Sequence, residues 1–494
     1  MSDGSDARND QLTISPWRLL PGPLVFLFTL LWPAPEGFAG TSWPVLGLTL
    51  WMALWWALEA VPLAATALLP LIVVPLVGVP QARQVLTEYS NPSVMLLIGG
   101  MLVALAMERW RLHERMAFAI MRRVGAEPRR LVLGMMVSTA FVSMWVSNTS
   151  TALMMLPVAM AIALLATPAA GGEGGTMAVG GDAQNFSAAM VLAVAYGATI
   201  GGMGTLIGTP TNALVQGFMA RNFGVDISFV DWLAFGLPTV GLLLPCAWLW
   251  LVRVGTPFDP RAVPVAVEAV EEGWRRLGPM STEERRIALV ALTAASLWIL
   301  RPWLAQWTPL ARLDDTVIAV AAGVAPFLIR ARDGGALLRA ADIQRLPWAV
   351  MLLFGGGLAL AAAIQESSLA DTLGVALAGL GSWPLPLLIV TMVLALIAWT
   401  ELNSNVSTAA TFMPIMAAVA AGSDHSVLTL VAPAAMAASA GFMLPVGTPA
   451  NALVFGTGRV TLRQMLRAGA GVNLAAAVII SLVGYLASDW LSKG

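Results

Sequence analysis

The stretch SNTSTALMMLP at residues 147–157 recurs as SNVSTAATFMP at residues 404–414. Two further pairs of motifs accompany it in the same order: VMLLIGG (94–100) with VMLLFGG (350–356), and GTPTNALV (208–215) with GTPANALV (447–454). The first motif precedes the second by 53 residues in one copy and by 54 residues in the other. Matched motifs in a matched order indicate that the chain contains two copies of one structural unit.

The composition around these motifs is that of a membrane protein. Hydrophobic residues make up 58% of the 494 positions, charged residues make up 11%, and the mean hydropathy is +0.78. Soluble domains carry about 25% charged residues, so much of this chain must be covered by lipid. The net charge of −1 gives no indication of a nucleic-acid partner. The single cysteine, Cys246, excludes a disulfide within the chain.

Apolar stretches long enough to cross about 30 Å of hydrocarbon occur throughout the sequence. Eleven of them predict transmembrane helices, near residues 17–34, 43–60, 62–80, 92–108, 188–218, 233–253, 285–305, 314–331, 347–366, 428–456 and 468–490. Two others, at 131–167 and 385–421, are 37 residues long with a polar cluster near the middle. Because non-helical backbone persists at membrane depth only where it is buried in protein or lines a cavity, these two predict re-entrant hairpins. The predicted fold class is an all-α polytopic membrane protein.

The distribution of arginine sets the predicted orientation. With the N-terminus in the cytoplasm and neither hairpin crossing the bilayer, 22 of the 26 arginines lie inside, as the positive-inside rule requires. The C-terminus then lies outside. The predicted units are an N-terminal tail with the first helix (1–40), a first repeat (41–253), a cytoplasmic linker (254–284) and a second repeat (285–494). An odd number of crossings in each repeat inverts the second copy, which is typical of secondary transporters with a site near the midplane.

Four shorter segments complete this prediction. Residues 109–128 and 367–382 look amphipathic, and we expect them to lie along the membrane surface. The Gly-rich stretch 168–187 predicts a flexible loop. The charged residues of 254–286 predict a solvated linker.

The tips of the two predicted hairpins carry side chains suited to binding an anion. Ser147, Asn148 and Thr149 in one tip, and Ser404 and Asn405 in the other, supply hydroxyl and amide donors without formal charge. The helix that begins after each tip also directs unpaired backbone N–H groups and the positive end of its dipole toward the same place. Two such tips that approach from opposite sides form a neutral pocket for a carboxylate or another oxyanion.

The two GTP motifs predict breaks in their helices. Pro210 and Pro449 interrupt helical hydrogen bonding, and Gly208 and Gly447 allow the backbone to turn. The carbonyl groups freed near these glycines can bind a small hard cation, as unwound helices in transporters do.

Hydroxyl groups near the tips complete a candidate sodium site in each repeat. Ser143 lies one helical turn before Ser147, and Thr400 lies five residues before Asn405. Ser143 with the amide of Asn148, and Thr400 with the amide of Asn405, offer hydroxyl and amide oxygens beside the freed carbonyls of their repeat. The alternative for Ser143 is a hydroxyl that bonds back to its own helix. The lack of carboxylates argues against tight calcium or magnesium binding.

The remaining polar residues have other interpretations. Glu59 precedes Pro62 at the end of a crossing, which favours a role at the helix end, and Asp314 and Asp315 are predicted to cap a helix. Glu401 is harder to dismiss, since a carboxylate inside the membrane is functional by default. In the first repeat Met144 stands at the matching position, so the role of Glu401 stays open.

The motifs SMWVSNTSTA (143–152), TELNSNVSTA (400–409), GTPTNALV and GTPANALV resemble the signatures of the divalent anion/sodium symporter family. That family includes sodium-dependent dicarboxylate and citrate transporters and sodium-independent dicarboxylate exchangers. The similarity covers nearly the whole chain after residue 15, including AMERWRLHERMA (106–117). The resemblance implies a homodimer in which each protomer has a scaffold domain and a transport domain that moves by an elevator mechanism.

The resemblance also assigns residues to sites. It implies that the substrate is held by Ser147, Asn148, Thr149, Ser404 and Asn405 and bordered by Thr209, Thr448 and Pro449. It implies one sodium ion at Ser143, Ser147, Asn148 and the Gly208 carbonyl, and a second at Thr400, Asn405 and the carbonyls near Asn403 and Gly447. Val406 stands where bacterial members often have a second threonine, which leaves one hydroxyl fewer in that tip, although animal carboxylate transporters resemble this pattern.

The sequence therefore predicts a sodium-coupled symporter of C4-dicarboxylates such as succinate, malate or fumarate, in a bacterial inner membrane. The alternatives are a sodium-independent exchanger of the same fold and a transporter of sulfate or tricarboxylates. An intramembrane hydrolase is disfavoured because Ser147 and Ser404 have no base beside them in the sequence. The sequence leaves the exact substrate and the ion stoichiometry open.

Overall fold

The computed structural model describes residues 16–38, 40–125, 127–165, 181–263, 267–310, 312–381, 383–423 and 425–488. Over these residues the fold is helical, and its only β-bridge is an isolated one between Arg330 and Ala336. The predicted N-terminal tail at residues 1–15, most of the Gly-rich loop and the C-terminal residues 489–494 lie outside the described part of the chain.

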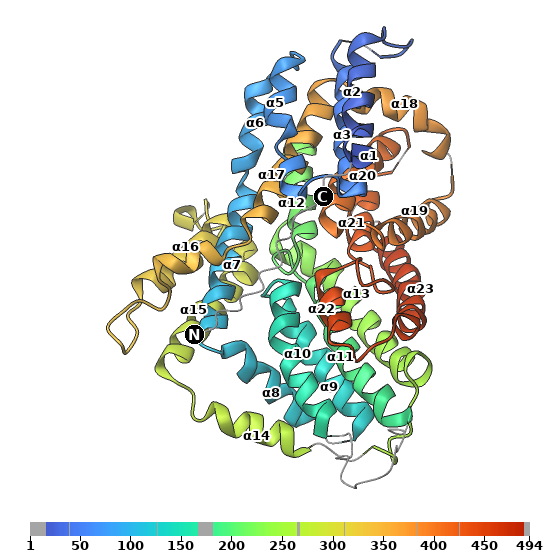
Figure 1. Ribbon diagram of the computed structural model, residues 1–494. Helices are drawn as coiled ribbons and strands as arrows, with labels where there is room; N and C mark the ends of the chain where they lie inside the picture. The colour runs from blue at the N-terminus through green and yellow to red at the C-terminus, as the bar shows by residue number, and fades with distance from the viewer. Residues whose placement is uncertain are drawn as a thin grey trace, which may run out of the picture.

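The helices of the first half run from the N-terminus to the predicted linker (Figure 1). They are α1 Pro16–Leu19, α2 Pro21–Leu31, α3 Ser42–Leu58, α4 Leu63–Thr66, α5 Leu69–Leu76, α6 Ala82–Thr87, the 3-10 helix Glu88–Ser90, α7 Pro92–Arg109, α8 Leu112–Val124, α9 Pro128–Ser143, α10 Asn148–Leu165, α11 Gly181–Gly202, α12 Pro210–Phe223 and α13 Phe229–Trp250. A short π-helix, Leu251–Gly255, extends α13.

The second half repeats much of this order. Its helices are α14 Val267–Leu277, α15 Thr282–Leu304, the 3-10 helix Thr308–Leu310, α16 Asp315–Leu328, the 3-10 helix Ala340–Arg345, α17 Trp348–Glu366, α18 Leu369–Gly381, α19 Leu385–Thr400, α20 Asn405–Ala421, α21 Val427–Ala438, α22 Pro449–Gly456 and α23 Leu462–Leu486. Helices α8 and α18 occupy the two segments predicted to be amphipathic.

Each of the eleven apolar stretches contains helix, which confirms the all-helical prediction. Six helical segments of the described chain are long and apolar enough to cross a membrane: Ala82–Arg109, Gly181–Gly202, Phe229–Gly255, Thr282–Leu304, Trp348–Glu366 and Leu462–Leu486. The other stretches hold shorter or interrupted helices. The number of crossings therefore stays a prediction.

Both predicted hairpins fold as helix–turn–helix pairs. In the first, α9 and α10 are joined by residues 144–147, and in the second, α19 and α20 are joined by residues 401–404. Each returning helix contains one proline, Pro157 in α10 and Pro414 in α20, ten residues after the serine of its motif. The matching shapes agree with the internal repeat, while the entry and exit of each pair on one side of a membrane stays a prediction.

Both predicted helix breaks are present. Helix α11 ends at Gly202 and α12 begins at Pro210, while α21 ends at Ala438 and α22 begins at Pro449. Proline fits the first turn of a helix because the N–H that it lacks has no partner there. Each break leaves a non-helical segment that ends with the Gly-Thr of a GTP motif.

The two repeats interlock around these breaks. Helix α22 of the second repeat packs against α10 and α11 of the first, and α12 of the first repeat packs against α20 and α21 of the second. Each short helix after a GTP motif therefore lies against the hairpin of the other repeat. This exchange brings both tips and both non-helical segments to the middle of the molecule (Figure 1).

The prediction of a solvated linker is wrong at its C-terminal end. Glu283 and Glu284 are each only 5% exposed. The Glu284 carboxylate accepts hydrogen bonds from Arg115 of α8 at 3.1 Å, and Glu283 accepts one from the backbone N–H of Arg332 at 2.7 Å. Helix α14 in the same segment packs against α8. Charge patterning suggested solvent because the sequence does not show the distant donors of these carboxylates, which are the Arg115 guanidinium for Glu284 and the Arg332 backbone N–H for Glu283.

The prediction of a flexible Gly-rich loop at 168–187 is wrong for its described residues. Residues 181–187 form the first two turns of α11, and this helix is almost entirely buried, so its small residues pack rather than form a loop.

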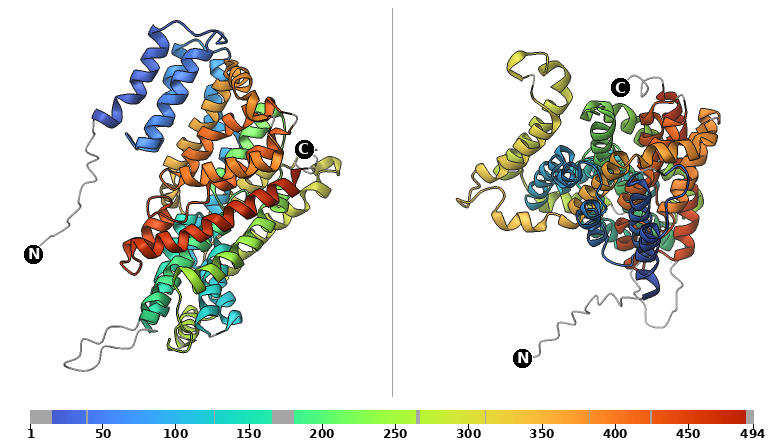
Figure 2. Two further views of the ribbon diagram at one scale, coloured as in Figure 1. Left: turned by 90° about the vertical axis from the view of Figure 1, so that its right-hand side faces the viewer. Right: turned by 90° about the horizontal axis from the view of Figure 1, so that it is seen from above.

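Helices α15 and α16 project from the body of the molecule (Figure 2). Their outward side chains are large and apolar, including Leu289, Leu292, Trp303 and Leu328, which are between 60% and 77% exposed. Such a surface is suited to lipid rather than water.

Candidate functional site

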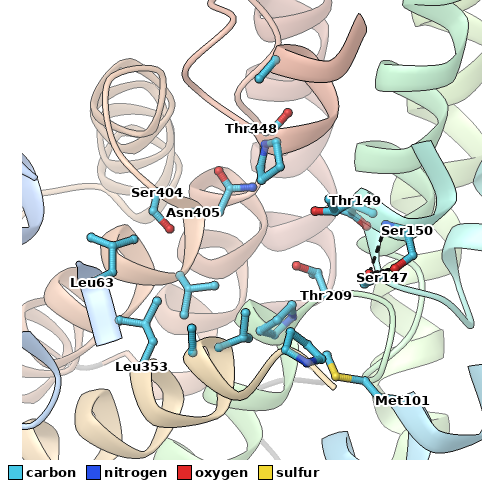
Figure 3. A pocket seen from close by; sticks show the side chains of 18 of the residues that line it. Leu63, Met101, Ser147, Thr149, Ser150, Thr209, Leu353, Ser404, Asn405 and Thr448 are labelled. Atoms are coloured by element: carbon cyan, nitrogen blue, oxygen red, sulfur yellow. Dashed lines mark hydrogen bonds between the residues drawn. The ribbon is translucent and has the colours of Figure 1, made fainter. Parts of the chain in front are cut away.

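One cavity of about 700 Å³ lies between the two hairpin tips. All nine residues predicted to contact substrate line it: Ser147, Asn148, Thr149, Thr209, Ser404, Asn405, Val406, Thr448 and Pro449. Figure 3 shows Ser147 and Thr149 on one side of the cavity, Ser404 and Asn405 across from them, and Thr209 and Thr448 between. The volume is in the range of small-molecule sites. The structure therefore gathers the predicted residues in one place, and their binding role stays a prediction.

The first tip is held in shape by its own hydroxyl groups. Ser147 Oγ donates to Ser150 Oγ at 3.0 Å and accepts from the backbone N–H of Ser150 at 3.3 Å. Helix α10 begins at Asn148 and helix α20 begins at Asn405, and both residues line the cavity. Two helix N-termini, each with positive dipole character, thus meet at one cavity whose tip residues carry no charge.

A cluster of three oxygen atoms lies behind the first tip. Ser143 Oγ lies 2.9 Å from Asn148 Oδ1 and 2.7 Å from the carbonyl oxygen of Ala198 in α11. Ser143 is fully buried, and its hydroxyl bonds to neighbouring segments rather than to its own helix, which rejects the alternative considered from sequence. Gly202 allows this approach, because a Cβ there would stand 2.3 Å from Asn148 Oδ1.

The second repeat reproduces the cluster. Thr400 Oγ1 lies 3.1 Å from Asn405 Oδ1 and 2.6 Å from the carbonyl oxygen of Ala438 in α21. Asn405 Nδ2 donates to the carbonyl of Ser439, which turns its Oδ1 toward Thr400. In each cluster one hydroxyl proton faces two acceptor oxygens, so oxygen lone pairs outnumber the donors. Such an excess of oxygen lone pairs suits a cation.

The other predicted sodium ligands occupy different places. Gly447 lines the cavity. Gly208 packs so closely on Gly202 that a Cβ at Gly208 would stand 2.5 Å from the Gly202 carbonyl oxygen. The side chain of Asn403 donates to the carbonyl of Trp399 at 3.1 Å. Asn403, Gly208, Ser143 and Thr400 do not line the cavity. Among the described residues, no three His, Cys, Asp or Glu side chains form a metal-binding group.

Two asparagines that the sequence interpretation left without a role hold the non-helical segments in place. Asn212 Nδ2 donates to the carbonyls of Gly202 (3.0 Å) and Thr205 (2.7 Å). Asn212 and its counterpart Asn451 are both fully buried. The doubled motif could have identified both, since asparagine follows proline by two residues in GTPTNALV and in GTPANALV.

Asn451 makes the equivalent pair of bonds in the second repeat. Its Nδ2 donates to the carbonyls of Gly441 (3.1 Å) and Leu444 (3.0 Å). The backbone N–H of Asn451 in turn donates to Thr448 Oγ1 at 3.1 Å. One amide thus bridges the ends of each non-helical segment.

Glu401 has a role that the sequence left open. Its carboxylate accepts hydrogen bonds from the backbone N–H groups of Phe442 (2.7 Å), Met443 (2.9 Å) and Leu444 (2.8 Å). Asn473 of α23 donates to it as well, at 2.6 Å. Glu401 is only 6% exposed and does not line the cavity. The carboxylate therefore satisfies the backbone of the broken helix rather than facing the cavity.

The first repeat has less need of such a carboxylate. Of the three corresponding N–H groups, those of Met203 and Gly204 donate to the carbonyls of Ile200 (3.2 Å) and Gly201 (2.9 Å). Because carbonyls of the preceding turn accept from these two groups, an apolar Met144 can stand where the second repeat has a glutamate.

Three charged residues were not predicted to lie on the cavity wall. Glu59, Glu108 and Arg345 line the cavity together with the tips. Glu59 is also the C-cap of α3, with a left-handed backbone (φ 46°), as its predicted role at a helix end requires. The Arg345 guanidinium pairs with the Glu108 carboxylate. No sequence pattern joins these residues, because they come from three distant segments.

Comparison with known proteins places this architecture among transporters. The family model described as the sodium:sulfate symporter transmembrane region matches residues 14–492. The sodium-dependent dicarboxylate transporter SdcS of Staphylococcus aureus strain USA300 is 40% identical over 471 residues, which cover 94% of this chain and 90% of that protein. The SdcS protein of strain NCTC 8325 matches to the same extent.

Two solved structures share the fold at low sequence identity. The YdaH transporter of Alcanivorax borkumensis aligns with a TM-score of 0.53 and 15% identity, over 90% of this chain and 99% of that one. MtrF of Neisseria gonorrhoeae, described as one of a class of antimetabolite efflux pumps, aligns with a TM-score of 0.55 and 10% identity, over 80% and 82% of the two chains. At these identities the likeness concerns the fold alone.

Proposed function

Because this chain belongs to the sodium:sulfate symporter family, we propose that it is a sodium-coupled symporter of C4-dicarboxylates such as succinate, malate or fumarate. It is an integral membrane transporter and not an enzyme. One observation carries the proposal: two uncharged tips face each other across one cavity, and each has an oxygen cluster directly behind it. The name of the SdcS relatives agrees with this assignment.

A dianion with a carboxylate at each end fits this symmetry. One carboxylate would bind Ser147, Asn148 and Thr149, and the other would bind Ser404 and Asn405. Val406 lines the second side without a hydroxyl, so that side offers fewer donors. Each tip adds the backbone N–H groups of a helix N-terminus.

Sodium would offset the charge of the substrate. A dianion in an uncharged buried site lacks compensation and is costly to desolvate. We place one sodium ion at Ser143, Ser147, Asn148 and the Gly208 carbonyl. We place the second at Thr400, Asn405 and carbonyls near Asn403 and Gly447. Each ion would share an asparagine with the substrate side of its tip, so the binding of ion and anion would be coupled.

The charges of the cavity wall favour this symporter over a sodium-independent exchanger. An exchanger needs a surplus of positive charge near the tips. Arg345 is the one basic residue among those that line the cavity, while Glu59 and Glu108 supply two carboxylates. The wall therefore carries a net charge of about −1 at pH 7, and it cannot replace the sodium ions.

We extend the proposal to the transport cycle and the assembly. The interlocked hairpins and broken helices would move as one transport domain, in an elevator mechanism, against a scaffold within a homodimer. The protein would lie in the bacterial inner membrane with its N-terminus in the cytoplasm. Counted from a cytoplasmic N-terminus, the predicted crossing 92–108 ends at Glu108 on the cytoplasmic side, and Arg345 lies on the same side between the crossings 314–331 and 347–366. The cavity described above would therefore be the inward-open one.

The test is uptake of labelled succinate by proteoliposomes that contain the purified protein. A sodium gradient should drive accumulation, and a potassium gradient of the same size should not. Uptake in potassium that requires a counter-substrate inside the vesicles would establish the exchanger instead.

A further inference from the structure

The mouth of the cavity contains an arginine that belongs to no predicted binding site. Arg345 ends the 3-10 helix Ala340–Arg345, directly before the start of α17. It lines the same cavity as the tips, and its side chain is 48% exposed. Among the described residues, only Glu108 accepts a hydrogen bond from its guanidinium. A guanidinium has five N–H donors, so several have no acceptor among the described residues.

The segment that carries Arg345 is firmly attached to the end of α7. Trp110 Nε1 donates to the carbonyl of Leu337 at 2.9 Å, and Arg109 pairs with Asp342. Leu337 and Leu346 are buried. Arg345 therefore occupies a fixed position on the wall.

We propose that Arg345 is a docking position for one carboxylate of the substrate at the mouth of the cavity, used as the anion passes between the tips and the aqueous phase. This inference rests on the proposed function. Glu108 acts as an internal competitor, because its carboxylate occupies the guanidinium when no substrate is there. The docking is therefore weak, which suits a position that must release its ligand.

The chemistry of the wall supports this assignment. Away from the tips the lining is largely apolar, with Met101, Ala104, Leu105 and Leu353 among its residues. The two carboxylates, Glu59 and Glu108, repel a dianion. Among the lining residues, Arg345 alone carries a positive charge that attracts the anion between the tips and the aqueous phase. Its planar fork of N–H groups matches a carboxylate.

The experiment compares four single variants with the wild type, in intact cells and in everted membrane vesicles. Arg345→Gln removes the docking charge, Arg345→Lys keeps the charge without the fork, and Glu108→Gln removes the competitor. Arg109→Gln is the matched control, since it breaks the neighbouring ion pair of the same segment but does not line the cavity. The half-saturation concentration for labelled succinate is measured in saturating sodium, after quantification of each variant in the membrane.

In everted vesicles, where substrate meets the predicted cytoplasmic side, Arg345→Gln should raise the half-saturation concentration about twofold to fivefold, the scale of a half-exposed ion pair. Arg345→Lys should fall between the wild type and Arg345→Gln. Glu108→Gln should lower it, because the guanidinium is then free. Arg109→Gln should leave it unchanged, and in intact cells Arg345→Gln should have a smaller effect.

Three results would overturn the docking role: equal shifts for Arg345→Gln and Arg109→Gln, a rise rather than a fall for Glu108→Gln, or equal effects of Arg345→Gln from both sides. These would mean that the ion pair only ties the segment to α7. Absence of sodium-dependent uptake by the wild type in both preparations would instead refute the symporter, and the docking role with it.

Discussion

Ser143 Oγ lies 2.9 Å from Asn148 Oδ1, across the turn of the first hairpin. Thr400 Oγ1 and Asn405 Oδ1 repeat this relationship at 3.1 Å in the second hairpin. In both pairs the hydroxyl faces away from the cavity side of the tip, toward a carbonyl of a broken helix. The asparagine thus stands between an oxygen cluster and the cavity, which under the proposed function is a direct physical route for coupling the ion to the anion.

Removal of either hydroxyl should weaken sodium binding more than substrate binding. Ser143→Ala and Thr400→Ala each take one oxygen from a cluster, a change of about 1 kcal/mol, and roughly 1.4 kcal/mol corresponds to tenfold in affinity. We expect the sodium half-saturation of succinate uptake to rise about fivefold with a smaller fall in maximal flux. Ser138→Ala is the control, because Ser138 is a buried serine of the same helix whose hydroxyl bonds to Ala117 at 3.1 Å.

Both tips should be needed for transport. Asn148→Ala and Asn405→Ala remove amide groups from a buried site, at about 1–3 kcal/mol per unsatisfied partner. Each variant should lose most succinate uptake while its amount in the membrane stays normal. Near-normal uptake by both variants would contradict the assignment of the cavity.

Asn212 and Asn451, which bridge the non-helical segments, should matter as much for transport as the tip residues, although neither lines the cavity. Asn212→Ala and Asn451→Ala each leave two buried carbonyls of a non-helical segment without their donor. We expect uptake to fall at least tenfold and the thermal unfolding midpoint to drop. Asn222→Ala on α12 is the control, because its amide bonds only to the carbonyl of Phe218 one turn earlier, and it should behave as the wild type.

Substitution of Glu401 should disturb the second sodium site and leave the first intact. In Glu401→Gln an NH₂ group replaces an oxygen that faces backbone donors, so at least one buried N–H loses its partner. Hydrogen bonds to a charged group contribute about 1.5–3 kcal/mol. The thermal unfolding midpoint should fall and the cooperativity of uptake with sodium should decrease. A variant with wild-type stability and sodium dependence would show that the carboxylate does not hold the broken helix.

Selectivity should follow the presence of two carboxylates. Two donor clusters on opposite sides of the cavity are both satisfied only by a dianion of suitable length. Malate should therefore compete with labelled succinate far more strongly than butyrate does. Equal competition by butyrate would mean that one tip alone determines recognition.

The repeats made much of this site predictable from the sequence. The doubled SN and GTP motifs located both turns and both helix breaks, because proline and glycine constrain the backbone locally. Together with the family resemblance, they identified nine residues as substrate contacts, and all nine line one cavity. Ser143 was predicted from its place one helical turn before Ser147, and Thr400 was predicted as the matching hydroxyl before Asn405 in the second repeat.

The remainder depends on contacts between segments distant in sequence. Glu401 stands at the position of Met144 in the first repeat, and its carboxylate accepts hydrogen bonds from backbone N–H groups that follow α21. No pattern near residue 401 in the sequence predicts these bonds. Arg345 and Glu108 meet across 237 positions of the chain. The burial of Glu284 depends in the same way on Arg115 of a separate helix. The sequence shows which residues are charged, but it does not show the distant partner that makes the burial of a charged side chain favourable.

The coupling of sodium to the dianion is the central claim, and the affinity for succinate measured by isothermal titration calorimetry tests it most directly. The dissociation constant should be compared in sodium and in potassium at equal ionic strength. The account predicts tighter binding in sodium, by a factor on the order of 5–150 as is typical of coupled sites, and the reciprocal increase in sodium affinity when succinate is present. An equal dissociation constant in the two salts would contradict it.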